Sequence, residues 1–181
     1  VGGCVGMASA VLDAGVTVAA LVVVNAAGSV LDPGSGMLSG TRYGLPGEFD
    51  HLRPPSEGDV AAWERAKVTS LNTTIGVVAT DATLTKAQCG KLAGVAHDGL
   101  ARAIRPAHTM VDGDTVFGLA TCDRPAPGQE PEVFGTGEAH VHDLLSAAAD
   151  VFSRAVAHAI LAATGREGAP AYLDVFPSAL R

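Results

Sequence analysis

The chain has 181 residues and a net charge of −7, and hydrophobic residues make up 48% of it while aromatic residues make up only 4%. This length suits one domain with a sizeable core, built mainly from Ala, Val, Leu and Ile. Because Lys and Arg form no cluster, the charge argues against a nucleic-acid partner and favours a small neutral or cationic substrate. The longest apolar stretches, 16–27 and 155–163, are shorter than the ~20 residues of a membrane span, so we expect no membrane segment.

Three cysteines, Cys4, Cys89 and Cys122, lie in apolar segments without paired ligand spacing. Buried free thiols in a reducing cytoplasm are the simplest interpretation, and no secretory signal is visible. The chain begins with Val-Gly-Gly-Cys and enters strand-like sequence almost at once. We therefore expect a piece of a longer, cytoplasmic protein.

In chain order, the first predicted elements are two strands and a loop. Apolar runs at 4–11 and 16–25 flank the turn Asp13-Ala14-Gly15, which is typical of an antiparallel hairpin. Most turn-forming residues follow between Asp32 and about Val68, which predicts a long loop with a helical turn near 60–67. A loop of this length in a compact domain is uncommon and tends to be functional.

Further strands and helices follow this loop. The β-branched run 75–79 predicts a buried strand, and Thr83 or Thr85 is expected to cap a helix that ends at Pro106. Residues 116–121 predict another strand, and apolar spacing predicts a long helix over 140–164. The order β-β-loop-β-α-β-α, with strands and helices in separate layers, indicates an α+β fold.

Three polar segments lie next to predicted strands. Asn72-Thr73-Thr74 precedes the strand at 75, Asp112-Gly113-Asp114 precedes the strand at 116, and Asn25 ends the second strand of the hairpin. Each alone has an ordinary interpretation: a loop-to-strand junction, a hairpin turn or partial calcium loop, and a turn asparagine.

Together, and in this order, these segments resemble the DmpA / L-aminopeptidase D-esterase family, peptidase family S58, with its nylon-oligomer hydrolases and β-aminopeptidases. The resemblance implies a layered αββα fold related to the ornithine acetyltransferases. It also implies a precursor that cuts itself between Asn72 and Thr73, so that 1–72 ends the larger subunit and 73–181 is the smaller one. Thr73 is then the expected nucleophile.

The first residue of a chain has a chemical advantage as nucleophile. A threonine hydroxyl is weak at neutral pH, but a free α-amine on the same residue, with a pKa of ~7.7–8, can take its proton. Cleavage therefore creates the general base. Before cleavage, the same hydroxyl can attack the carbonyl of Asn72 and form an ester that water resolves.

The resemblance also suggests roles for the other two segments. Asp112 and Asp114 match a pair of polar residues beside the nucleophile, and two carboxylates this close can share a proton, so that one stays protonated near neutral pH. Asn25 matches an asparagine whose amide N–H lies near the nucleophile, where a fixed donor contributes ~2.7–4 kcal/mol to transition-state stabilisation. No cofactor or metal is implied.

The resemblance covers nearly all of this chain but only the C-terminal half of a typical family member. We expect a missing N-terminal segment of the same protein, which in the family carries a tyrosine at the oxyanion site and a lysine near the nucleophile. We also expect homo-oligomers and a small peptide, amide or ester substrate. An acyltransferase of the ornithine-acetyltransferase type and an inactive truncated fragment remain alternatives.

The histidines are assigned to structural roles. His140-x-His142 lacks a third ligand at convincing spacing, so a solvent-exposed pair is expected rather than a zinc site. His97 and His108 are interpreted as packed, hydrogen-bonded side chains, although either can line a pocket.

Overall fold

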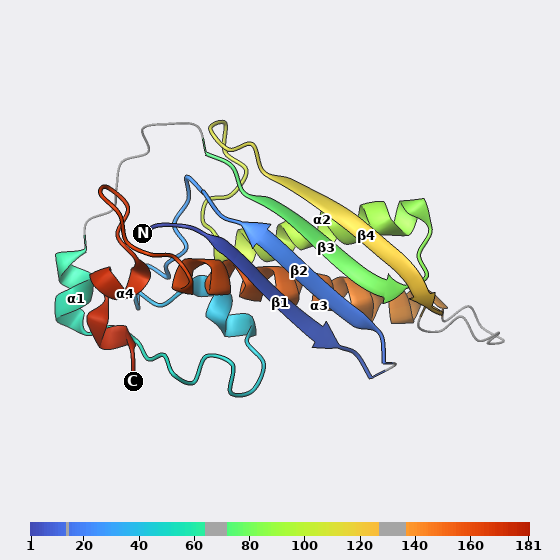
Figure 1. The fold of residues 1–181 in the computed structure, drawn as a ribbon, viewed down its shortest axis with the longest axis horizontal. Helices are drawn as coiled ribbons and strands as arrows, with labels where there is room; N and C mark the ends of the chain where they lie inside the picture. The colour runs from blue at the N-terminus through green and yellow to red at the C-terminus, as the bar shows by residue number, and fades with distance from the viewer. Residues whose placement is uncertain (14, 64–71, 127–136) are drawn as a thin grey trace.

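A four-stranded mixed sheet is the frame of the molecule (Figure 1), and the computed structural model describes residues 1–13, 15–63, 72–126 and 137–181, without the side chains of 137–140. The strands lie in the order β1-β2-β3-β4, with β1 at Val5–Val11, β2 at Thr17–Val23, β3 at Ile75–Ala82 and β4 at Thr115–Arg124. β2 is antiparallel to both β1 and β3, whereas β3 and β4 are parallel. The predicted hairpin is confirmed, although Ala14 of its turn lies outside the described residues.

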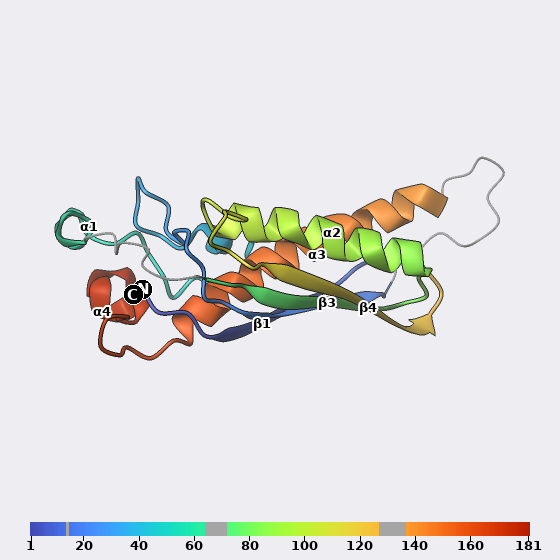
Figure 2. The ribbon, with the colours of Figure 1, turned by 90° about the horizontal axis from the view of Figure 1, so that it is seen from above.

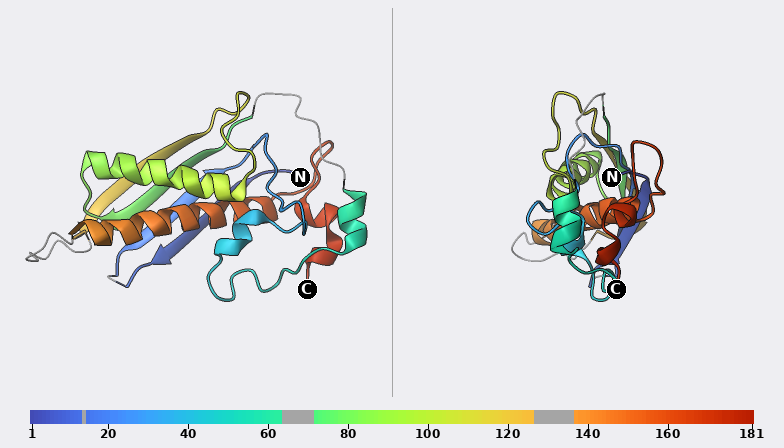
Figure 3. Two further views of the ribbon diagram at one scale, coloured as in Figure 1. Left: turned by 180° about the vertical axis from the view of Figure 1, so that it is seen from behind. Right: turned by 90° about the vertical axis from the view of Figure 1, so that its left-hand side faces the viewer.

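Two long helices cover one face of the sheet (Figures 2 and 3). α2, Lys86–Ala103, connects the parallel strands β3 and β4, and α3, Gly137–Leu161, packs beside it. Thr85 caps α2 as predicted, since its side chain accepts the backbone N–H of Gln88 in a capping box. α3 begins and ends three residues earlier than predicted. The α+β prediction is confirmed.

The long loop between β2 and β3 contains two short helices. η1, Ser39–Tyr43, is a 3₁₀ helix, and α1, Glu57–Ala62, begins earlier than the predicted turn because the Ser56 side chain caps it by accepting the Asp59 N–H. Residues 64–71 lie outside the described residues. Two further short helices, α4 at Tyr172–Val175 and η2 at Pro177–Ala179, were not predicted.

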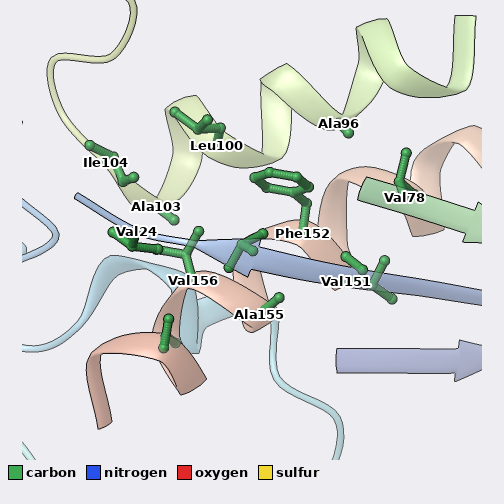
Figure 4. Packing of buried hydrophobic residues seen from close by; sticks show 14 of the residues in the cluster. Val24, Val78, Ala96, Leu100, Ala103, Ile104, Val151, Phe152, Ala155 and Val156 are labelled. Atoms are coloured by element: carbon green, nitrogen blue, oxygen red, sulfur yellow. The ribbon is translucent and has the colours of Figure 1, made fainter. Parts of the chain in front are cut away.

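The core lies between the sheet and the two long helices and consists mainly of Ala, Val, Leu and Ile, as expected (Figure 4). Phe152 of α3 is fully buried and packs against Gly76 of β3. A β-carbon on Gly76 would lie 2.5 Å from the Phe152 ring, so this strand position accommodates the ring only as glycine. α3 also approaches β1 closely, because a β-carbon on Gly6 would lie 2.2 Å from the carbonyl oxygen of Ala155.

The opposite face of the sheet, which faces the viewer in Figure 1, carries exposed apolar side chains. Met7 is 65% exposed, Phe117 59% and Leu119 52%. The strand register places Met7, Leu21, Val77 and Phe117 side by side across all four strands. The described residues therefore provide one helical layer and one sheet of the predicted αββα arrangement, and leave this outer face uncovered.

Part of α3 has the length and composition of a membrane-spanning helix, although the sequence predicted no membrane segment. Its segment Val141–Leu161 is long and apolar enough to span a membrane, which the search for uninterrupted apolar runs overlooked. However, 67% of the most apolar 18-residue stretch of this helix is buried inside the molecule, as in the core helix of a globular domain.

The cysteines are free, but the prediction that they are buried is wrong. Cys4 and Cys89 are half-buried, and Cys122 is exposed near the end of β4. The apolar neighbours of Cys122 do not bury it, because β4 is an edge strand and its last four residues are all exposed.

Candidate active site

The polar segments selected from the sequence meet at one end of the sheet, where β2 ends and β3 and β4 begin (Figure 1). Thr73 donates its backbone N–H to the carbonyl oxygen of Asn25 at 2.9 Å. On the other side, Asn72 pairs with Asp112 in a parallel bridge that extends the pairing of β3 with β4. The structure thus brings together residues from three segments that lie far apart in the sequence.

The peptide bond between Asn72 and Thr73 is held in direct contact with the Thr73 side chain. The carbonyl oxygen of Asn72 accepts the Thr73 hydroxyl at 2.6 Å and the backbone N–H of Gly113 at 2.9 Å. A β-carbon on Gly113 would lie 3.0 Å from Thr73 Oγ1, so a side chain there would crowd the hydroxyl. A backbone donor therefore polarises the same carbonyl that the hydroxyl touches.

Asn25 contacts Thr73 through its main chain. Its carbonyl oxygen accepts the Thr73 N–H, while its exposed side chain makes no hydrogen bond to any other described residue. The proposed role of its amide as an oxyanion donor stays a prediction. The structure adds that the Asn25 carbonyl oxygen accepts the N–H of Thr73, the nitrogen that cleavage would release as a free amine.

Asp112 is fixed by donors from two loops. Its Oδ1 accepts the Ala27 N–H at 3.2 Å, and its Oδ2 accepts the Thr109 N–H at 3.1 Å and the Thr109 hydroxyl at 2.6 Å. Burial raises the pKa of Asp112, but these hydrogen bonds and the nearby His108 lower the pKa below its ordinary value overall. Asp112 is therefore ionised at neutral pH.

Asp114 is held by a different set of donors, and its side chain is only 3% exposed. Its Oδ1 accepts the Thr74 N–H at 2.8 Å, and its Oδ2 accepts the His108 backbone N–H at 3.3 Å and lies 2.9 Å from His108 Nδ1. No hydrogen bond joins the two carboxylates in the part of the chain that the structure describes. Each carboxylate has its own donors, and the prediction that Asp112 and Asp114 share a proton stays a prediction.

Two histidines line the site, an outcome that the sequence analysis allowed without giving them a catalytic role. His97 Nδ1 lies 3.2 Å from His108 Nε2, and the ring centroids are 4.7 Å apart. An open cavity of about 560 Å³ is lined by His97, His108, Asp112, Gly113, Asp114 and Thr115. The available sequence signal was the position of His108 close before the acidic turn.

The remaining candidate ligands do not converge. His142 is exposed, and the side chain of His140 lies outside the described residues. Among the residues searched, no group of three or more His, Cys, Asp or Glu side chains has the geometry to hold a metal ion.

Comparison with known proteins identifies the family. The model of peptidase family S58 matches residues 1–171. The chain belongs to this family. An uncharacterized aminopeptidase of Mycobacterium leprae is 47% identical over 181 residues, which cover 98% of this chain and 49% of that protein. The S58 chain described here thus spans about half the length of the curated relatives it matches.

Two solved structures of aminopeptidases share the fold. A Burkholderia sp. β-aminopeptidase superposes with a TM-score of 0.54 and 26% identity, covering 98% of this chain and 49% of that one. The L-aminopeptidase D-Ala-esterase/amidase of Ochrobactrum anthropi gives a TM-score of 0.52 and 25% identity, covering 89% and 40%. The second is described as a variant of the Ntn hydrolase fold and a prototype of the serine aminopeptidases.

Proposed function

We propose that this chain is the catalytic part of a self-processing N-terminal-nucleophile hydrolase, which cuts itself between Asn72 and Thr73 and then uses Thr73 on amide or ester bonds. The observation that carries this proposal is the 2.6 Å contact between the Thr73 hydroxyl and the Asn72 carbonyl oxygen. Family membership supports the hydrolase class, and the contact supports the position of the nucleophile.

Self-cleavage would begin with attack of Thr73 Oγ1 on the carbonyl carbon of Asn72. The C–N bond breaks, the hydroxyl proton passes to the Thr73 nitrogen, and an ester links Asn72 to Oγ1. Charge that develops on the Asn72 oxygen is stabilised by the Gly113 N–H at 2.9 Å. Water then hydrolyses the ester, which leaves a carboxylate on Asn72 and restores the Thr73 hydroxyl.

After cleavage, the new α-amine of Thr73 would serve as general base for its own hydroxyl. The Asn25 carbonyl, 2.9 Å from this nitrogen before cleavage, is suited to orient the amine. Asp114 holds the next residue, Thr74, by its backbone N–H at 2.8 Å. The nucleophile would thus be fixed from both sides while it forms an acyl-enzyme with a small amide or ester, which water resolves.

The substrate class follows from the relatives and the charge of the chain. The names of the similar proteins describe an aminopeptidase, a β-aminopeptidase and an aminopeptidase with esterase and amidase activity. A substrate with a free amino group suits a chain with a net charge of −7. We therefore propose small amino-acid amides, esters and short peptides as substrates.

The uncovered outer face of the sheet supports a further part of this proposal. Large apolar side chains such as Met7 and Phe117 are costly to leave in water together, and a contiguous apolar face usually marks an interface. We propose that a preceding segment, equivalent to the first half of the relatives, covers this face as the second sheet. The complete protein then consists of this preceding segment joined to the chain described here.

The first test is intact-mass analysis of the complete protein and its Thr73 variants after incubation at neutral pH. Wild type is expected to give a fragment that begins at Thr73, whereas Thr73→Ala, which lacks the hydroxyl, stays one chain. Thr73→Ser, the matched control, keeps a hydroxyl and should still be cut. An uncut wild type, or the same fragment from Thr73→Ala, overturns the proposal.

The second test concerns the outer face. When the preceding segment and this chain are co-expressed as separate polypeptides, we expect them to co-purify. Phe117→Glu should abolish co-purification, because a charge would be buried in the interface. Leu45→Glu, which alters a comparably exposed apolar residue (49%) in a loop outside the sheet, is the control. Equal recovery of wild type and Phe117→Glu would show that another surface joins the two parts.

A further inference from the structure

His108 has an unusual backbone conformation. Its φ is 56°, in the left-handed region that non-glycine residues adopt only when their surroundings impose it. Both its backbone N–H, at 3.3 Å, and its ring Nδ1, at 2.9 Å, face Oδ2 of Asp114. The conformation therefore brings two donors of one residue to a single carboxylate oxygen.

The other end of that carboxylate reaches the proposed nucleophile. Asp114 Oδ1 accepts the N–H of Thr74, the residue directly after Thr73. The Asp114 side chain is 3% exposed, so these donors take the place of water around it. His108 is thus one carboxylate away from the backbone of the nucleophile, without touching the peptide bond at Asn72.

Ionisable groups from two elements of the described chain interact with the pair His97 and His108. α2 contributes His97, at 3.2 Å from Nε2, and also Asp98, whose charge acts on His97. The acidic turn contributes Asp112 and Asp114. Among these groups no Lys or Arg supplies a permanent positive charge, so the proton on the imidazoles decides the charge that faces Asp114.

We propose that His108 is a positioning residue that fixes Asp114 beside the nucleophile, and that the proton on its ring makes cleavage after Asn72 dependent on pH. This inference rests on the proposed function. With a neutral His108 ring, the charge of Asp114 is left to the backbone donors that it accepts, including the Thr74 N–H. A protonated ring forms an ion pair with Oδ2 of Asp114 and weakens the hold of Oδ1 on the Thr74 N–H, so cleavage slows when the imidazole carries its proton.

The experiment follows self-cleavage of the newly synthesised complete protein. Protein from cell-free translation is moved to buffers from about pH 5 to about pH 9, and the fragment that begins at Thr73 is followed by intact mass. For wild type we expect the rate to fall toward the acid end of this range, where an imidazole takes up a proton.

The decisive variant is His108→Gly, because glycine adopts the left-handed conformation without strain. If His108 only occupied a strained turn, this variant would fold at least as well and cleave at the wild-type rate. A positioning role instead predicts cleavage slower by about tenfold or more, the usual effect of losing a polar contact with a charged group, and loss of the acid-side fall. His108→Asn, which tolerates this conformation and keeps a donor, should recover part of the rate.

His97→Asn is the matched control, because His97 belongs to the same pair but makes no hydrogen bond to Asp114. It should cleave within a few-fold of wild type and keep the acid-side fall. Circular dichroism and thermal unfolding check that each variant is folded. If wild type is never cut, the proposed function fails together with this inference. If wild type is cut and His108→Gly shows the same rate and pH profile, only the inference is overturned.

Discussion

Two clusters in the described part of this chain pair a carboxylate with histidine, but only one of them also contains an arginine. In the first, Glu48 accepts Arg154 Nε at 2.7 Å and Nη2 at 3.0 Å, and lies 2.7 Å from His158 Nε2. The side chains of Arg154 and Glu48 are 6% and 13% exposed. Arg154 also donates to the carbonyl oxygen of Ser9 in β1, so this cluster joins the loop after η1, helix α3 and the edge strand.

In the second cluster, Asp114 contacts His108, and His108 contacts His97, beside an open cavity. Its described partners include no Arg or Lys. A guanidinium keeps its charge at every physiological pH, whereas an imidazole gains or loses a proton near neutrality. The comparison therefore separates a carboxylate that anchors the fold from one whose surroundings respond to pH.

The largest expected effect on stability comes from removing the Glu48 carboxylate. Glu48→Ala leaves the buried Arg154 without its carboxylate, and we expect the free energy of unfolding to fall by about 3–5 kcal/mol. Chemical denaturation of the wild-type and variant chains measures this difference.

Asp150→Ala is the control for that prediction. It removes the carboxylate of the Arg102–Asp150 pair, whose side chains are 38% and 44% exposed. Such an exposed ion pair contributes at most about 1 kcal/mol. Equal losses in the two variants would mean that Glu48 is no more important than a surface carboxylate, and the distinction between the clusters would fail.

The strands and long helices were predictable because their signals are local. The hairpin follows from two Val-rich runs around a turn, and α2 follows from Thr85, Gln88 and apolar residues at helical spacing. The uncovered face was not predictable, because Met7 and Val78 are equally apolar in the sequence, yet they point to opposite faces of the sheet. The contacts of Glu48 span 106 and 110 residues and leave no local pattern.

The candidate site was only partly predictable. Thr73, Asn25, Asp112 and Asp114 were selected by family resemblance, and the pairing of strand ends explains why they meet. The backbone donor of Gly113 and the left-handed conformation of His108 were missed, since the first depends on contact with Asn72 from another segment and the second leaves no sequence pattern. The sharing of a proton by the two aspartates was inferred from their spacing and stays a prediction, whereas some of the donors that each accepts come from other segments and leave no local pattern.

A smaller effect is expected on the pH dependence of stability, and it tests whether the Glu48 carboxylate stabilises the fold through its charge. Burial raises the pKa of Glu48, but hydrogen bonds from Arg154 and His158 outweigh it and lower the pKa from 4.5 to about 2. The resulting stability is present above about pH 5 and is lost as pH falls toward the folded-state value, because the unfolded chain binds the proton first. A shift of this size corresponds to about 3 kcal/mol in a fully buried pair, and solvent screening reduces it here to about 1–2 kcal/mol. Denaturation from about pH 6 to about pH 2 should show a shallower loss of stability in Glu48→Gln than in wild type, and parallel curves would show that this carboxylate is not the source of the acid sensitivity.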